Sequence, residues 1–181
     1  MGCGVQRAGP AFARQPAHDR QHGRARSSAC RRTQKNGQEA VGRSRGGLTT
    51  KIHAVVDGRG LPVGLTLTPG QAHDLTAVPA LIDVVPANSR LIADKAYDAD
   101  WLRALLRERR VRTCIPATQS RRMPRRYSKI LYRERNLIER FFNRLKHARR
   151  IATRFEKHAI NFLAAVQIVA ILIWARFEST T

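Results

Sequence analysis

The chain has 181 residues, of which 34 are lysine or arginine and 13 are aspartate or glutamate, so its formal net charge is +21. An apolar fraction of 43% excludes a chain that is disordered throughout, and three widely spaced cysteines argue against a disulfide scaffold or a cysteine zinc site and fit a reducing cytoplasm. A soluble domain with this charge needs a polyanion as partner, and nucleic acid is the partner that the charge predicts.

Residues 1–40 are expected to form a disordered basic segment. The first 46 residues carry 10 basic and 2 acidic side chains and are rich in Gly, Arg, Gln, Ser and Pro. They show neither a helical nor a strand period, and they contain no continuous apolar run of the kind that a secretory signal needs. A segment of this composition is expected to bind DNA loosely through its charge.

Two alternating segments around a short glycine-containing turn predict a β-hairpin. The first is Lys51–Asp57 and the second is Leu61–Thr68, and the residues between them, Gly58-Arg-Gly60, favour a turn. Pro69-Gly70 then ends the second strand. We expect the apolar residues of both strands to face a common core.

The middle of the chain alternates between helical and extended patterns. We expect a helix begun by Asp74 and ending near Val85, a strand Leu91–Asp94, a helix begun by Asp98 and spanning Trp101 to about Arg110, and a strand Thr113–Pro116. Trp101 is assigned to the buried face of its helix. This order predicts an α/β fold built on a sheet of mixed strand directions with flanking helices.

The last third of the chain is basic and helical. Residues 103–157 carry 19 basic and 4 acidic side chains, which makes this block the expected surface for phosphates. A basic loop over residues 118–129 precedes a long helix from Leu131 to about Arg149, and a last helix spans Asn161 to about Phe177. The apolar run in that last helix is shorter than the roughly 20 residues that cross a bilayer, so we expect a buried helix and no membrane partner.

One face of the long helix carries a set of polar side chains. Tyr132, Arg135, Glu139 and Lys146 fall within roughly 60° of one another at 100° per residue. Asp94 ends a buried strand, and carboxylates at a strand end and on an adjacent helix can gather around Mg²⁺. The competing interpretation is a helix covered by ion pairs, with Asp94 as a turn former.

These residues resemble a known family. Asp94-Lys-Ala-Tyr97 resembles the second-aspartate motif of bacterial insertion-sequence transposases with a DDE active site, and Tyr132-x2-Arg135-x3-Glu139-x6-Lys146 matches their Tyr-Arg-Glu-Lys signature at every spacing. The segments Gly42–Gly47, Thr68–Asp74 and Arg149–Arg154 are similar to connecting segments of that family, so the resemblance covers about residues 40–177.

The resemblance implies a fold and a chemistry. It implies a ribonuclease-H-like fold in which Asp94 and Glu139 are the second and third catalytic carboxylates and metal ligands. Tyr132, Arg135 and Lys146 would be the supporting signature residues. It also implies two Mg²⁺ ions, which stabilise the attacking and leaving oxygens when DNA strands are cut and joined.

The chain departs from the family before Gly42. In the family the first catalytic aspartate lies on the first and central strand, in a string like Ile-Asp-Ser-Thr. The only aspartate in that part of this chain is Asp19, which lies between His18 and Arg20. Codons for residues 18–26 can encode Met-Ile-Asp-Ser-Thr-Val-Val-Arg when they are shifted forward by one base. We therefore hypothesise that residues 1–40 are out-of-frame translation, and that residues 41–177 are an incomplete catalytic domain without its central first strand.

The sequence thus predicts a transposase fragment that is defective in DNA cleavage and strand transfer, with its two-metal site incomplete. The expected DNA contacts are Arg43, Arg45, Arg121, Arg122, Arg125, Arg126 and Lys129. Expected partners are double-stranded DNA at transposon ends and targets, a second copy, or intact transposase, in the bacterial cytoplasm at the nucleoid. The alternative is a non-catalytic DNA-binding remnant that sequesters element ends or intact transposase. Such a remnant would keep its affinity in EDTA and without Asp94 and Glu139.

Overall fold

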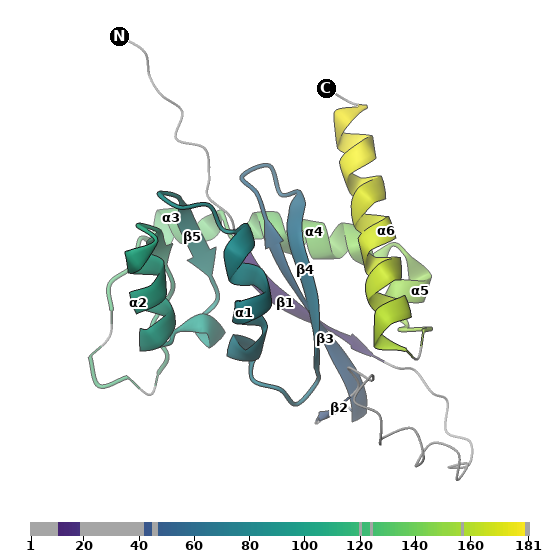
Figure 1. The fold of residues 1–181 in the computed structure, drawn as a ribbon, viewed down its shortest axis with the longest axis horizontal. Helices are drawn as coiled ribbons and strands as arrows, with labels where there is room; N and C mark the ends of the chain where they lie inside the picture. Colours follow the sequence, from purple (N-terminus) through teal and green to yellow (C-terminus); the bar gives the residue numbers. More distant parts are fainter. Residues whose placement is uncertain are drawn as a thin grey trace.

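Six strands form one mixed sheet with helices on both faces (Figure 1). The computed structural model describes residues 11–18, 42–44, 47–119, 121–123, 125–156 and 158–179, with only the backbone given before Thr49. The strands are β1 (Ala11–His18), β2 (Gly42–Ser44), β3 (Gly47–Val56), β4 (Pro62–Pro69), β5 (Arg90–Ala93) and β6 (Arg112–Cys114). Their order is β2-β3-β1-β5-β6, with β4 also paired to β3. This sheet confirms the predicted α/β fold with mixed strand directions.

The predicted hairpin is confirmed as β3 and β4, which pair antiparallel from Thr50 opposite Pro69 to Val56 opposite Pro62. Its turn is held by Asp57, whose Oδ1 accepts hydrogen bonds of 2.9 Å from the backbone amides of both Arg59 and Leu61. Gly60 has a φ of +80°, a conformation that glycine adopts without a steric penalty. The turn residues therefore fix the register in which the two strands pair.

The prediction that the central strand is absent is wrong for this structure. Strand β1 pairs antiparallel with β3, from Ala11 opposite Val56 to His18 opposite Thr49, and parallel with β5. Without β1, both β3 and β5 would present unpaired backbone groups, and any extended segment can satisfy these because the ladder is made by the main chain. Pro16 lies in this strand without an N–H to donate. Residues 1–10 and 19–40 of the predicted disordered segment lie outside the described residues.

The segment after β4 folds as short pieces rather than as one helix to Val85. These are η3 (Asp74–Ala77), α1 (Val78–Leu81) and η4 (Ile82–Val84). The cap is His73, whose Nδ1 accepts from the Leu75 amide at 3.3 Å, and not Asp74. Asp74 is buried and accepts a hydrogen bond of 2.9 Å from Lys51 Nζ. The acid at this position therefore anchors the segment to β3.

Helix α2 (Asp100–Glu108) follows a short turn, η5 (Lys95–Tyr97). The N-cap of α2 is Ala99, which makes no side-chain capping bond, so the prediction that Asp98 begins this helix as a cap is wrong. Trp101 is 48% exposed, contrary to its predicted place on the buried face, whereas Leu102 and Leu106 are buried. The inner stripe of α2 is therefore made by its leucines.

The predicted long helix is divided into α3 (Lys129–Arg133) and α4 (Asn136–Lys146), and α5 (Arg149–Ala152) follows it. At the division, the Leu137 amide donates to Glu134 O at 3.0 Å and the Ile138 amide donates to Arg135 O at 3.1 Å. These three-residue hydrogen bonds are tighter than those of an α-helix. They separate α3 from α4 at Arg135, a residue of the predicted signature.

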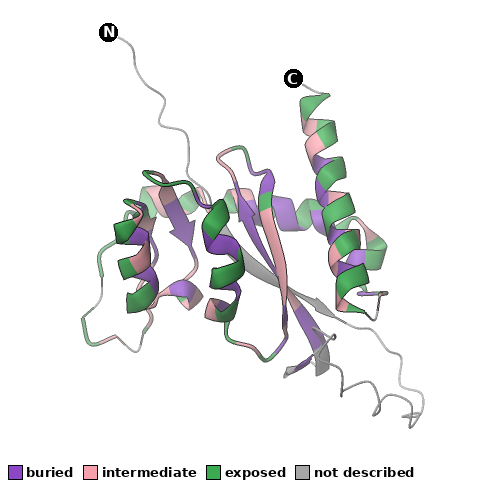
Figure 2. Ribbon diagram, in the orientation of Figure 1, coloured by how far each residue is buried: buried purple, intermediate pink, exposed green. Residues whose placement is uncertain are grey.

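Buried residues lie in the sheet and in the helices beside it (Figure 2), and their apolar side chains form one core on each face of the sheet. One core joins Ile52, Ala54 and Val56 of β3 to α4 and α6 (Ala159–Glu178), through residues that include Phe141 and Phe162. The other joins β5 to α1 and α2. Because both faces are covered, the central strands are buried on both sides and can place polar groups inside the domain.

Helix α6 is not the buried helix that the sequence predicts. Its buried residues are Phe162, Val166, Ala170 and Ile173, one stripe of a 20-residue helix. By length and composition α6 could cross a membrane, and only 22% of its most apolar 18-residue stretch is buried in the structure. Trp174 Nε1 also donates to Pro62 O at 2.8 Å, so one side of α6 is fixed to β4.

Candidate active site

Asp94 lies at the carboxyl end of β5, where the strand gives way to η5. Its Oδ1 accepts a hydrogen bond of 2.7 Å from the Lys95 amide, which makes Asp94 the N-cap of that turn. The side chain is 39% exposed. The turn therefore holds the carboxylate in place while leaving its second oxygen open to neighbours and solvent.

Arg135 joins Asp94 to Glu139. Its Nη2 donates to Glu139 Oε1 at 2.5 Å, and its Nη1 lies 3.8 Å from Asp94 Oδ2. Glu139, in the first turn of α4, is 50% exposed. The two carboxylates from separate elements thus meet at one guanidinium group.

Tyr132 completes this cluster. Burial raises the pKa of its hydroxyl; nearby Arg135 opposes the rise, and the charge of Asp94 and the hydrogen bond to it add to the rise. The Cζ atom of Arg135 lies 5.5 Å from the centre of the Tyr132 ring. The Tyr127 ring packs edge-on against the Tyr132 ring, with 5.4 Å between the two ring centres. Lys146 lies in the last turn of α4, about 10 Å along the helix axis from Glu139. Three of the four signature residues therefore gather around Asp94.

The donor set does not fit a two-metal centre. Within the described residues, no three side chains of His, Cys, Asp or Glu lie together in a way that could hold a metal ion. Phe12 of β1 pairs with Ala93, so the next position on the central strand, beside Asp94, is Ala13. Alanine has no oxygen to offer there, and the guanidinium of Arg135 already occupies one oxygen of Glu139 and balances one of the two negative charges that the described residues bring together.

A buried polar network supports the turn at Asp94. His53 on β3 is fully buried, with Nδ1 at 2.9 Å from the Tyr97 hydroxyl and Nε2 at 2.7 Å from Thr68 Oγ1. Tyr97 ends the turn that Asp94 caps. This network was not predicted from the sequence, although a histidine between the apolar residues Ile52 and Ala54 was a signal for it.

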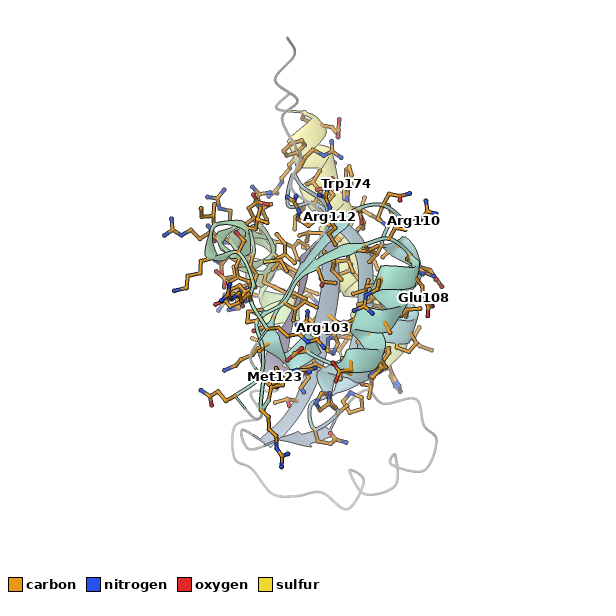
Figure 3. The ribbon with its side chains drawn as sticks, turned by 90° about the vertical axis from the view of Figure 1, so that its left-hand side faces the viewer. Arg103, Glu108, Arg110, Arg112, Met123 and Trp174 are labelled. Carbon is orange, nitrogen blue, oxygen red and sulfur yellow. The ribbon has the colours of Figure 1, made fainter. Side chains whose placement is uncertain are left out.

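A second buried network centres on Asp98, whose side chain is 0% exposed. It accepts hydrogen bonds from the Thr118 amide at 2.9 Å and from Arg121 Nε at 2.7 Å, and Arg103 Nη2 lies 2.8 Å away. Burial alone would raise the pKa of Asp98, but the bonds from Thr118, Arg121 and Arg103 bring it below its ordinary value. Figure 3 shows Arg103 on the inner side of α2. Asp98 thus ties the basic loop to α2.

The loop arginines expected to contact DNA fall into two groups. Arg121 and Arg125 donate to Asp100 at 2.8 and 3.1 Å, so part of their charge is neutralised. The others, Arg122, Arg126 and Lys129, are exposed on the loop and the start of α3. The side chains of Arg43 and Arg45 lie outside the described residues.

Further exposed cations follow Glu139 on the outer side of α4 and in α5. They are Arg140, Arg144, Lys146, Arg149 and Arg150, of which Arg150 is paired with Glu156 at 2.8 Å. They lie in the basic block of residues 103–157 that the charge distribution predicted as a surface for phosphates, although among them only Lys146 was predicted individually, as a signature residue.

Comparison with known proteins places this geometry in context. Residues 16–174 match the family model described as a transposase DDE domain. A putative transposase for insertion sequence element IS6501 of Brucella ovis is 41% identical over 130 residues, which is 71% of this chain and 100% of that protein. A putative transposase for IS402 of Burkholderia cepacia is 32% identical over 136 residues, 69% of this chain and 61% of that protein. The transposase for IS1106 of Neisseria meningitidis is 29% identical over 110 residues, 56% of this chain and 37% of that protein. No solved structure matches the chain.

Proposed function

Because the chain belongs to the family of bacterial insertion-sequence transposases with a DDE domain, we propose that it binds transposon DNA and that its strand-cleavage centre is incomplete. The observation that carries this proposal is the meeting of Asp94 and Glu139 at Arg135. A strand-end carboxylate and a helix carboxylate lie together, as a cleavage centre of this family requires. The strand order around β1 also supports the ribonuclease-H-like fold that the sequence suggested.

The incomplete centre explains why we expect no turnover. The family resemblance implies two Mg²⁺ ions, but the described part of the chain brings only two carboxylates together here, and the position beside Asp94 on β1 is Ala13. A guanidinium at 2.5 Å from Glu139 competes with any cation for the same oxygens. We therefore propose that Asp94 and Glu139 are the remains of a metal site and hold at most a weakly bound ion.

The chain's own cations supply the DNA affinity. Exposed arginines and lysines of the 118–129 loop, α4 and α5 face solvent near the carboxylates. Phosphate binding by such side chains releases counterions, so the affinity falls steeply with salt. Contacts of this kind orient a duplex without reading its sequence.

The second candidate is a binder that sequesters element ends or pairs with intact transposase. The bridge from Arg135 to both carboxylates favours it, because the guanidinium holds the two acids together and balances half of their charge without a metal. The two candidates differ in what their activity requires. Strand cleavage would need Asp94, Glu139 and divalent ions, whereas charge-driven binding needs none of these.

The experiment is fluorescence anisotropy with a labelled duplex from the element ends, in Mg²⁺ or in EDTA. We expect equal affinity in both, equal affinity for an Asp94→Asn, Glu139→Gln double variant, and a steep linear fall of log affinity with log salt. Affinity that disappears in EDTA and in the double variant would indicate a working metal centre. No binding at low salt would refute DNA binding.

We also propose that residues 1–40 arose by out-of-frame translation. The proposal rests on the codon compatibility of residues 18–26 with Met-Ile-Asp-Ser-Thr-Val-Val-Arg. The nucleotide sequence around codon 18 tests it directly, since a codon set that cannot encode this string in the next frame refutes it. A DNA-binding protein of this family would act in the bacterial cytoplasm, at the nucleoid.

A further inference from the structure

The outer face of α6 is apolar and has no partner among the described residues. While one stripe of the helix packs on the sheet, Ile160, Ile168, Ile171 and Leu172 on the opposite side are 69, 59, 64 and 51% exposed. In Figure 2 the helix stands at the side of the molecule with exposed residues along its length. A row of large aliphatic side chains in water marks an interaction surface.

The centre of this face has the spacing of a helix-pairing seam. Ala164, Ile168, Ile171 and Ala175 are separated by 4, 3 and 4 residues, which is the repeat that keeps side chains on a seam between two helices. The order small, large, large, small is also the same from either end. A helix with such a stripe is complementary to a second copy of itself in the opposite direction.

We propose that this stripe is the contact between two copies of the chain, which pair through antiparallel α6 helices. A two-fold axis between Ile168 and Ile171 places each of these isoleucines against the other in the second copy, and each Ala164 against an Ala175. Such an interface is isologous and closed, so it gives a dimer and not a fibre. The antiparallel direction also places the positive N-terminal end of each helix beside the negative C-terminal end of the other.

The structure favours a second copy over a lipid bilayer. Phe162, Val166, Ala170 and Ile173 hold α6 to the core, and Trp174 donates to Pro62 O at 2.8 Å. The helix could enter a bilayer only by leaving the sheet. The seam itself contains no charged side chain that a second copy would repel.

The size of the contact sets the expected strength. A helix of 20 residues is about 30 Å long, and one face of it buries less than the roughly 800 Å² per partner of a standard interface. We therefore expect a reversible dimer with a dissociation constant in the micromolar range. Dimerisation does not require DNA, so it can be measured on the nuclease-treated full chain whether or not the proposed function holds.

Cysteine cross-linking tests the geometry. In a full-length background in which Cys3 and Cys30 are replaced by Ser, Ala164→Cys and Ala175→Cys are made separately. Cys114 is buried and stays. The antiparallel pair predicts a disulfide-linked dimer when the two proteins are mixed under oxidation, and none from either alone, because a disulfide needs Cα atoms within about 7 Å. Cross-linking of each protein with itself would show a parallel pair, and an unlinked mixture would exclude the contact; either result overturns the proposal.

Sedimentation velocity at 0.5 M salt tests the energetics. We expect Ile168→Glu to weaken dimerisation at least tenfold, while Ile130→Glu, the same change at an isoleucine of α3 that is 76% exposed, leaves it unchanged. Circular dichroism shows whether both variants stay folded. A wild type that is monomeric at 100 μM, or equal effects of the two variants, would refute the proposal. The proposal would also be refuted if the wild type were monomeric and floated with phosphatidylcholine–phosphatidylglycerol vesicles, and if Ile168→Glu but not Ile130→Glu abolished this flotation. The exposed face of α6 would then bind a lipid surface.

Discussion

Replacing Asp98 by Asn is expected to destabilise the domain strongly. The Asp98 carboxylate is 0% exposed and compensates Arg103, whose side chain is only 10% exposed. The substitution removes the negative charge but keeps the size of the side chain, so Arg103 is left as a buried cation without its counter-charge. Breaking a buried pair in this way costs about 3–5 kcal/mol. This is a large part of the 5–15 kcal/mol by which a domain is stable.

The free energy of unfolding can be measured by urea titration at pH 7, followed by the fluorescence of Trp101 and Trp174. Asp100→Asn is the matched control, because Asp100 is the other acid that binds Arg121 but is 69% exposed. We expect this control to change the unfolding midpoint little, since exposed ion pairs contribute little. An Asp98→Asn midpoint equal to that of the control would refute the reasoning.

The pH dependence gives an independent check. The pKa of Asp98 is lowered in the folded chain, so its contribution to stability is present above the unfolded pKa of about 3.9 and is lost as the pH falls through the folded value. The stability difference between wild type and Asp98→Asn should therefore be constant from pH 5 to pH 8 and should shrink below about pH 4. A difference that grows on acidification would contradict the assigned direction of the shift.

Three other changes test the site. Tyr97→Phe removes a buried hydroxyl 2.9 Å from His53 and should cost about 1–3 kcal/mol in urea unfolding; no loss would mean that the network is not formed. Arg135→Ala frees two carboxylates from their guanidinium, so calorimetry should show tighter Mn²⁺ binding than wild type, and unchanged binding would contradict the bridge. Ala13→Asp adds a carboxylate beside Asp94 and should also strengthen Mn²⁺ binding; an affinity equal to wild type would contradict the register of β1.

The sequence was sufficient where local patterns decide the structure. Alternation of apolar residues around a glycine turn predicted the hairpin, and the resemblance to a known family predicted that Asp94 and Glu139 would lie near each other. Tyr132 and Arg135 lie with them even though the predicted single helix is broken at Arg135. The tight turn between α3 and α4 interrupts the helix but leaves these side chains close to one another.

Other features depend on contacts between distant segments, which no local pattern encodes. Strand β1 has an unremarkable sequence and is selected by the free backbone edges of β3 and β5. Asp98 resembles a helix cap locally, but its partners include Thr118 and Arg121, which are 20 and 23 residues away. The exposure of α6 could not be foreseen either, because an apolar helix has the same composition whether it is buried or paired with a second copy.

A nicking assay on supercoiled DNA that carries the element ends, with Mg²⁺ or Mn²⁺, tests the proposed function most directly. An incomplete carboxylate centre predicts that the chain binds this DNA but releases no nicked circles above a no-protein control. Repeated turnover that requires the metal and is lost in Glu139→Gln would show that a working catalytic centre exists in this chain, and would contradict the proposal.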